Sequence, residues 1–578
     1  MRWKVGLIGC AISLHAMTAC SPRPRAAEAA SLVLRNGTIA TVDPAKPRVE
    51  AIAFSGDTIA ALGSNSEIAP YVGPNTQVID LAGQFAMPGF IDGHGHFMNL
   101  GQAKMNLDLM EVKNWDEIVA MVGEAARRAK PGDWILGRGW HQEKWDKRPE
   151  PNVEGFPIHD VLSKASPNNP VMLTHASGHA AFVNAKAMQA AGITSRTPNP
   201  SGGEILKDKT GRPIGLLRER ASGLADQAYA AWRAQKTPEE NRADAHRRIE
   251  LAVDEALANG VTSFQDAGED FATIDIIKDA LTNGELGVRL WVMVRDSNDN
   301  LKAKLAAYKA IGLGDKRLTI AAIKKTLDGA LGSRGAWFLE PYADLPGHTG
   351  LNTMPVSEVE EAAKIALDTG VQLCVHAIGD RTNRTVLDIY EAAFKSHPDL
   401  KDLRWRIEHA QHLNAADIPR FGQLGVIASM QGIHATSDAP FVVARLGAAR
   451  AEEGAYVWQK LMKTGTIVSN GTDTPVERIN PIANFYATVT RKLKDGSTFY
   501  PDQRMTRDEA LKSYTWNAAY AAKEETIKGS LAPGKLADVT VLSKDILTIP
   551  EEEILSTKVI YTIVGGKIAY RADGRLTN

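Results

Sequence analysis

The stretch FAMPGFIDGHGH, residues 85–96, joins an apolar run to two histidines that are one residue apart. The residues before His94 and His96 are typical of a buried β-strand. In an extended segment, side chains two positions apart point to the same side, so both imidazoles can reach one cation. Two histidines at this spacing also occur in polar loops, so the interpretation depends on what the rest of the chain supplies.

Seven further apolar segments with the composition of buried strands follow, and helical stretches such as SEVEEAAKIALDTG lie before several of them. The segments are VTSFQDAG, VRLWVMV, LTIAAIKKTLDG, VQLCVHAIGD, RWRIEHAQ, VIASMQ and TIVSNGTD. With the first strand they make eight, and eight repeats of strand and helix are what a closed parallel barrel requires. The predicted fold is therefore α/β, with a (β/α)8 TIM-type barrel over residues 87–525.

Both ends of the ordered chain have a different pattern. Residues 31–86 contain short β-rich runs broken by Asn-Gly, Ser-Gly-Asp and Ala-Gly, and similar runs return in residues 526–578. Each end alone offers too few strands to bury a face, so we expect one small β-sandwich built from both chain ends. The longest gap between barrel strands, residues 99–260, predicts an inserted cap, in which Trp140 and Trp145 either line an apolar pocket or belong to the core.

Composition bounds the class of protein and its partners. Of the 578 residues, 44% are hydrophobic and 23% are charged, and the formal net charge is −1. This balance indicates a globular protein and gives no sign of disorder or of a broad attraction to nucleic acid. Basic residues are scattered, without a basic patch interleaved with aromatic residues, so we expect no nucleic-acid partner.

Residues 1–20 have the features of an export signal, with a basic start, a brief apolar stretch and the ending MTAC. That ending resembles a bacterial lipoprotein processing site with Cys20 as the acylated residue. Met17 differs from the usual Leu, which leaves ordinary secretory cleavage open. Residues 21–30 would form a tether. We therefore predict an exported protein, either a lipoprotein on the periplasmic face of a bacterial membrane or a periplasmic or secreted protein, with membrane contact only through a lipid on Cys20.

Polar side chains that are able to bind a metal ion occur at the ends of the predicted barrel strands. They are His94 and His96 after the first strand, Lys324 in the fourth, His376 in the fifth, His409 in the sixth and Asp473 after the eighth. The C-terminal ends of the strands form the face on which barrel enzymes build their active sites. This joint placement favours one metal site over scattered surface residues.

The chain resembles the metal-dependent amidohydrolase superfamily, specifically the amidohydrolase-3 branch that includes N-substituted formamide deformylase-like proteins. The resemblance runs from about residue 31 to the end and is carried by PGFIDGHGH, IKKTLDGALGSR, HAIGDRTNRTVLDIYE, RIEHAQ, SNGTDTPV and GSLAPGKLADVTVL. It implies that one divalent ion is held by His94, His96 and Asp473. A second ion would be held by His376 and His409, and zinc is the expected metal.

The same resemblance implies that Lys324 bridges the two ions. An unmodified lysine is a cation, but an amine carboxylated by CO2 becomes an anionic carbamate with an oxygen for each ion. Neighbouring residues on a strand face opposite sides, so only one of Lys324 and Lys325 can point at the metals. The spacing of Lys324 to Asp328 matches the family, and a buried lysine paired with an acid is the structural alternative.

These features predict a hydrolase that cleaves carbon–nitrogen bonds of amides, N-acyl or N-formyl amines with a metal-activated hydroxide. Asp473 would accept the water proton and return it to the departing amine.

His434 and His179 resemble family positions that face the substrate, and a structural role for each stays open. Gly432 stands where relatives usually have Pro. Asp380 would orient His376 or a neighbouring loop.

Two alternatives accompany this interpretation. A cyclic amide hydrolase or a deaminase would use the same site with a different pocket. A lipid-anchored binding protein would keep the barrel and be catalytically silent, although the retention of every type of metal ligand argues against it. The expected partner is a small-molecule amide-type substrate. The sequence leaves the oligomeric state open, with a homodimer as one alternative, since exposed barrel helices commonly pair.

Overall fold

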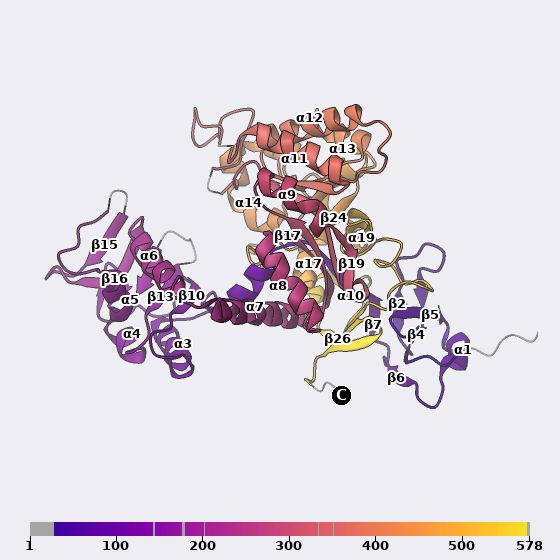
Figure 1. Cartoon of the computed structure of the whole chain (residues 1–578), viewed down its shortest axis with the longest axis horizontal. Helices are drawn as coiled ribbons and strands as arrows, with labels where there is room; N and C mark the ends of the chain where they lie inside the picture. The colour runs from indigo at the N-terminus through magenta and orange to yellow at the C-terminus, as the bar shows by residue number, and fades with distance from the viewer. Residues whose placement is uncertain are drawn as a thin grey trace, which may run out of the picture.

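The computed structural model describes residues 28–142, 145–175, 180–200, 203–332, 334–350 and 352–574. The predicted export signal, including Cys20, lies outside these residues, so export and lipidation stay predictions. Three bodies follow one another across the molecule, with a lobe at one end, a barrel in the middle and a β-sandwich at the other end (Figure 1).

The central sheet contains all eight predicted strands in chain order, and each neighbouring pair is parallel. The strands are β8 (Phe90–Gly95), β17 (Val261–Glu269), β18 (Arg289–Val294), β20 (Leu318–Thr326), β21 (Gln372–Ala377), β22 (Arg406–His409), β23 (Ile427–Met430) and β24 (Val468–Asn470). Most of their residues are buried, as expected for strands with helices outside and side chains filling the inside. The TIM-type α/β prediction is confirmed. The short β19 (Ala310–Gly312) pairs antiparallel with β20.

Helices cover the outside of the barrel and connect its strands. They include α7 (Pro238–Ala258), α8 (Phe271–Thr282), α9 (Asn298–Tyr308), α11 (Val356–Thr369), α12 (Asp380–Ser396), α13 (Ile418–Leu424), α14 (Gly432–Leu446) and α17 (Pro481–Thr490). Shorter helices are α10 (Leu313–Lys316), α15 (Ala448–Gly454), α16 (Trp458–Met462), α18 (Arg507–Ser513) and α19 (Trp516–Ala521). Their apolar faces and the strands form one large core cluster.

The barrel is brought nearly to closure by hydrogen bonds just beyond the last strand. The backbone N–H of Asp473 donates to the carbonyl of His94 at 2.7 Å, and the N–H of His96 donates to the carbonyl of Thr474 at 2.8 Å. Three of the four residues that carry these bonds, His94, His96 and Asp473, are predicted metal ligands. Closure of the barrel therefore places Asp473 beside the two histidines.

Two glycines allow the first and last strands to approach this closely. A Cβ on Gly93 would lie 2.5 Å from the carbonyl oxygen of Asn470, and a Cβ on Gly471 would lie 2.3 Å from the backbone nitrogen of His94. Both contacts are with backbone atoms, which cannot rotate away as a side chain can. Any side chain at either position would force the closing strands apart.

The β-sandwich is built from both chain ends, as predicted. One sheet has the order β5-β4-β1-β6, and the other has the order β27-β26-β25-β7-β2-β3. The strands are β1 (Leu32–Arg35), β2 (Thr38–Ala40), β3 (Arg48–Val49), β4 (Ala51–Ser55), β5 (Thr58–Gly63), β6 (Gln77–Asp80), β7 (Phe85–Pro88), β25 (Val539–Leu542), β26 (Val559–Val564) and β27 (Lys567–Arg571). The short helices α1 (Asn65–Ile68) and α20 (Glu551–Ile554) accompany them. The stretch 85–94, predicted as one strand, divides at Gly89 into β7 of the sandwich and β8 of the barrel.

The insertion forms a lobe around a mixed sheet with the order β15-β16-β14-β13-β10-β9. Its strands are β9 (Leu107–Asp108), β10 (Ile135–Trp140), β13 (Val171–His175), β14 (Ala180–Val183), β15 (Gly203–Lys207) and β16 (Pro213–Glu219), with the small hairpin β11 (Asn152–Val153) and β12 (Phe156–Pro157). Its helices are α3 (Trp115–Arg128), α4 (Asp160–Ala165), α5 (Ala185–Ala190) and α6 (Ser222–Arg233). Trp140 and Trp145 pack with ring centroids 6.0 Å apart, Trp140 within the lobe core and Trp145 partly buried against it, which favours the core alternative.

The lobe is joined to the barrel through α2 (Phe97–Met105) and α7, which pack closely along each other. A Cβ on Gly101 would lie 2.0 Å from the carbonyl oxygen of Arg248. Figure 1 shows α7 running between the lobe and the barrel. Within the part of the chain that is described, no helix has both the length and the apolar character needed to span a bilayer.

Candidate metal centre

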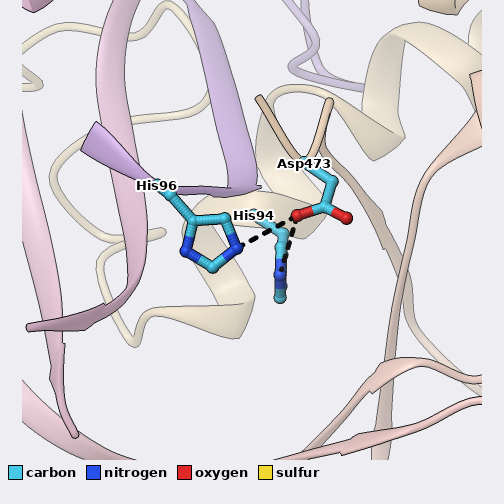
Figure 2. A group of neighbouring side chains, drawn as sticks. All are labelled: His94, His96 and Asp473. Carbon is cyan, nitrogen blue, oxygen red and sulfur yellow. Dashed lines mark ion pairs between the residues drawn. The ribbon is translucent and has the colours of Figure 1, made fainter. Parts of the chain in front are cut away.

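Three side chains from the closing strands meet at the mouth of the barrel (Figure 2). The Nε2 atom of His96 lies 3.2 Å from Oδ1 of Asp473, and Nε2 of His94 lies 3.6 Å from the same oxygen. One ligand atom from each of the three residues falls within 4.8 Å of the others. A nitrogen–nitrogen–carboxylate set at this separation has the chemistry and the size to hold a divalent cation.

The local backbone aims Asp473 at the histidines. Asp473 has a φ of 58°, a left-handed conformation that costs a non-glycine residue on the order of 1–3 kcal/mol. The preceding Thr472 is held by Asp92, whose carboxylate accepts the Thr472 backbone N–H at 2.9 Å and its hydroxyl at 2.5 Å. Asp92 lies on β8, so the strand that carries the histidines also fixes the turn that carries Asp473.

A second group of histidines adjoins the first. The rings of His376 and His409 have centroids 4.4 Å apart, and the ring of His409 lies 4.7 Å from that of His94. His409 ends β22 with a φ of 77°. This left-handed turn breaks the alternation of the strand and directs His409 to the same side as Glu408, which precedes it. The structure therefore brings the predicted second-ion ligands against the first set.

His94 and His409 are buried, and each has an acceptor oxygen beside one ring nitrogen. Nδ1 of His409 lies 2.8 Å from Oε1 of Gln431, and Nδ1 of His94 contacts Oε2 of Glu408. Nε2 of His376 lies 3.5 Å from Oδ1 of Asp328 but makes no hydrogen bond within the described residues. A neutral imidazole carries one N–H, and an acceptor beside one nitrogen favours the proton on that nitrogen. In His94 and His409 the other nitrogen, Nε2, then keeps its lone pair for a cation.

His434 has the opposite arrangement. Its Nδ1 lies 3.0 Å from the amide nitrogen of Gln411, which can only donate, so Nδ1 accepts and Nε2 carries the proton. That Nε2 lies 3.8 Å from Oδ2 of Asp473. His434 is 6% exposed. It therefore presents a hydrogen-bond donor to the site, although its ring could also complete a ligand group with His409 and Asp473.

The turn before His434 is tightly held at Gly432, the position where relatives usually have proline. The N–H of Gly432 donates to Oδ1 of Asn470 at 2.9 Å, a bond that proline could not make. A Cβ at this position would lie 2.0 Å from Oγ1 of Thr488. Glycine therefore suits the close packing of α14 on α17.

The two neighbouring lysines point to opposite sides of β20. Lys324 is 2% exposed, and the carboxylates of Glu408 and Asp473 interact with its charge inside the barrel. The amine of Lys325 donates instead to the backbone carbonyl of Asp296 at 3.0 Å. Lys324 is thus the lysine that faces the candidate metal centre.

Burial and neighbouring charges set the ionisation of the site. Burial lowers the pKa of His94 to about 4 and lowers the pKa of Lys324 from its ordinary value. Burial also holds the pKa of His376 and of His409 well below the ordinary value. For Asp473, burial alone would raise the pKa, but His96 and the other nearby histidines hold it well below its usual range. At neutral pH His94, His376 and His409 are neutral and Asp473 is ionised, which is the state that binds a cation.

Unpartnered atoms show that the residues present fit a metal ion. Nε2 of His94 and Oδ1 of Asp473 are buried and make no hydrogen bond within the described residues. Buried polar atoms are nearly always hydrogen-bonded, so atoms without a partner need an explanation. A cation between them would satisfy both.

The other predicted site residues have different outcomes. His179 lies outside the described residues. The carboxylate of Asp380 accepts the backbone N–H of Leu339 at 2.7 Å, so it orients a neighbouring loop, and Asp328 is the acid that lies beside His376. Cys374 is fully buried on β21, where burial raises its thiol pKa, as expected for a structural residue.

Sequence reasoning missed the acceptors Glu408 and Gln431. Glu408 directly precedes His409, and strict strand alternation would send the two side chains to opposite faces. Only the left-handed turn at His409 brings both to the site. The repeated pattern of a polar residue at the end of each strand was the available signal.

A TIM-type barrel with histidines and an aspartate converging at its mouth defines the class of metal-dependent barrel hydrolases. A sequence profile of the amidohydrolase family matches residues 77–570, and the chain belongs to that family. It is 33% identical over 570 residues to the protein LONG AFTER FAR-RED 3 of Arabidopsis thaliana. The alignment covers 96% of this chain and 94% of that protein.

Two further comparisons agree with this assignment. The chain is 28% identical over 553 residues to the N-substituted formamide deformylase of Arthrobacter pascens, covering 94% of this chain and 99% of that enzyme. The crystal structure of an uncharacterized metal-dependent hydrolase from Pyrococcus furiosus is similar with a TM-score of 0.70 and 28% identity, covering 89% of this chain and 100% of that one. The resemblance predicted from the sequence motifs is confirmed.

Proposed function

We propose that this protein hydrolyses the carbon–nitrogen bond of a small amide, such as an N-acyl or N-formyl amine, with two divalent cations, zinc being the expected metal. One ion would be held by His94, His96 and Asp473, and the other by His376 and His409. The observation that carries the proposal is the buried pair formed by Nε2 of His94 and Oδ1 of Asp473, which lie 3.6 Å apart without a hydrogen-bond partner within the described residues.

A cation held by these residues supplies an acidified water, with a pKa of about 7, and polarises a substrate carbonyl. The side chains around it would handle the protons. Asp473 is ionised and accepts a proton at a carboxylate oxygen, then returns it to the departing nitrogen. The Nε2–H of His434 donates to the oxygen on which negative charge develops.

Lys324 would bridge the ions as a carbamate. Formation of the carbamate requires a neutral amine, which attacks the carbon of CO2, forms an N–C bond and releases a proton. Burial lowers the pKa of Lys324, so a larger fraction of its amine is neutral than for an exposed lysine. Within the described residues no carboxylate is close enough to Lys324 to form an ion pair.

Metal analysis of the purified protein and a substrate panel test the proposal together. The panel contains an N-formyl amine, an N-acyl amine, a cyclic amide, an aminopurine and an ester, each measured before and after chelation. We expect two zinc ions per chain and cleavage of an open-chain amide that is lost with the metal. Preference for the cyclic amide or the aminopurine would support the cyclic amide hydrolase or the deaminase instead.

A double variant, His94→Asn with His96→Asn, removes two ligands of the first ion. Loss of a residue that only hydrogen-bonds a metal ligand typically lowers activity about 10–100-fold. Loss of two ligands should lower it by more. His397→Asn is the matched control, since His397 is exposed at the end of α12 and should leave metal content and rate unchanged. Full activity in the double variant, or activity that survives removal of the metal, would exclude the proposal.

A further inference from the structure

Glu408 is a fully buried carboxylate inside the barrel to which the proposed chemistry assigns no role. It lies on β22, is 0% exposed and shares the interior face of the strand with Arg406, two positions earlier. A buried charge is costly unless it is paired and hydrogen-bonded. The contacts of Glu408 therefore show how its buried charge is compensated.

Arg406 holds one side of the Glu408 carboxylate. Its Nε lies 2.7 Å from Oε1, and its Nη2 donates to Oε2 at 3.1 Å. The guanidinium is itself fixed, because it donates to the carbonyl of Gly93 at 2.7 Å, to Oγ of Ser429 at 2.8 Å and to Oε1 of Gln265 at 2.5 Å. These partners come from β8, β23 and β17, so the position of the carboxylate is set by four strands of the barrel.

The other contact of Glu408 is with His94. Oε2 lies against Nδ1 of the imidazole, and both side chains are wholly buried. A carboxylate paired with a guanidinium acts as an acceptor at its other contacts, so Oε2 accepts from Nδ1 of His94. The imidazole proton is then on Nδ1, and the lone pair is on Nε2, which is directed at Asp473.

We propose that Glu408, braced by Arg406, is a positioning residue that fixes the tautomer and the orientation of His94 as an Nε2 ligand before a cation binds. This inference rests on the proposed metal function. A carboxylate behind a ligating histidine raises its basicity and limits its rotation, and loss of such a partner typically costs about 10–100-fold in metal affinity. The alternative is that the Arg406–Glu408 pair only ties the strands together.

Zinc affinity, measured by competition with a chromogenic chelator, separates the two roles. In Glu408→Gln the charge is lost, and the amide can turn either its oxygen or its nitrogen to His94, so the tautomer is no longer fixed. We expect zinc affinity to fall about 10–100-fold. Ser429→Ala is the matched control, because it removes one bond of Arg406 and leaves the contact between Glu408 and His94 in place. It should bind zinc within about twofold of the unsubstituted protein.

A double-mutant cycle with His94→Asn tests whether Glu408 acts through His94. If it does, Glu408→Gln should cause no further loss of zinc affinity once His94 is replaced. A purely structural role predicts the same loss in both backgrounds, and that result would overturn the inference. So would unchanged affinity in Glu408→Gln.

Glu408→Asp covers the case in which the glutamine variant fails to fold. It keeps the charge that pairs with Arg406, but its side chain is one methylene shorter and draws the carboxylate away from His94. We expect a folded protein with weakened zinc binding, and undiminished binding would count against the inference. If the unsubstituted protein binds no zinc or other divalent cation, the proposed function fails, and the inference fails with it. If it binds zinc and every Glu408 variant binds equally well, only the inference fails.

Discussion

The barrel and the inserted lobe bury very different side chains. The barrel interior contains Lys324, Arg406, Glu408 and Asp473, whereas the lobe core is formed by apolar residues such as Trp140. Among the described residues, every buried Asp, Glu, Lys or Arg lies outside the lobe. Both regions fold around sheets, but of the two only the barrel contains buried charged side chains in the part of the chain that is described, and several of these lie at the candidate metal centre.

This contrast also separates two sources of stability. The lobe depends on burial of apolar surface, at roughly 25 cal/mol per Å2. The barrel additionally depends on charges that are individually unfavourable and are tolerated only in complete networks. Removing one member of a barrel network should therefore cost more than removing an exposed charge from the lobe, and only the barrel should acquire a strong dependence on pH.

The largest stability effect should come from the ion pair that joins the barrel to the sandwich. Arg289 on β18 contacts both carboxylate oxygens of Asp538, at 2.7 and 2.9 Å, and both side chains are buried. Replacing Arg289 by Met leaves Asp538 buried without its cation, which typically costs about 3–5 kcal/mol. We expect a correspondingly lower urea midpoint.

The control for Arg289→Met is an ion pair of the lobe. Arg212 contacts Asp160 at 3.2 Å, but both side chains are about half exposed. Arg212→Gln should change the stability by no more than about 1 kcal/mol. Equal losses in the two variants would show that burial does not distinguish barrel charges from lobe charges.

The lobe should respond most to loss of apolar volume. Leu162 on α4 is 0% exposed and belongs to the same core cluster as Trp115 and Ile118. Leu162→Ala should destabilise the lobe by about 2–5 kcal/mol through the cavity it leaves. Hydrogen exchange should rise in lobe peptides, while the amount of metal bound by the barrel stays the same.

The neighbouring Val161→Ala is the matched control for the cavity, since Val161 is 47% exposed. It should change the stability by no more than about 0.5 kcal/mol. Faster exchange throughout the barrel strands in Leu162→Ala would mean that the lobe and the barrel unfold as one unit. The two regions would then differ in the side chains they bury but not in their stability.

The sequence was informative where local pattern decides the structure. All eight barrel strands were predicted, because long apolar runs with polar ends are specific to buried parallel strands. The division of the stretch 85–94 at Gly89 was missed, since both halves are apolar and only the tertiary structure assigns them to different sheets. The strand order of the lobe depends on non-local pairing, which periodicity does not encode.

At the candidate site, too, the sequence predicted local features but not those that depend on non-local contacts. Alternation predicted that only one of Lys324 and Lys325 faces the metals, but the strand pattern alone could not decide which. Glu408 was missed because its approach to His94 depends on the backbone conformation at His409 and on the closed barrel. Residue types at strand ends can be predicted from sequence, whereas the hydrogen bonds that orient them require the assembled fold.

The smallest of these effects concerns pH and a buried histidine of the barrel. His412 is 2% exposed, and neither ring nitrogen makes a hydrogen bond within the described residues. Burial, with a contribution from Arg450, lowers its pKa to about 3. Between that value and the ordinary pKa of about 6.5, the unfolded chain binds a proton that the folded protein does not. Stability is therefore lost as the pH falls below about 6.5, by about 1.4 kcal/mol per pH unit for this one group.

Replacing His412 by Leu keeps a side chain of similar size and removes the titration. The difference in unfolding free energy between the two proteins, measured with chelator present from pH 7.5 to 5, should shift in favour of His412→Leu as the pH falls. His397→Leu is the control, because it replaces an exposed histidine by the same side chain. Parallel pH profiles for the His412 variant and the unsubstituted protein would mean that the folded protein also takes up this proton, and that the barrel tolerates a further charge at His412.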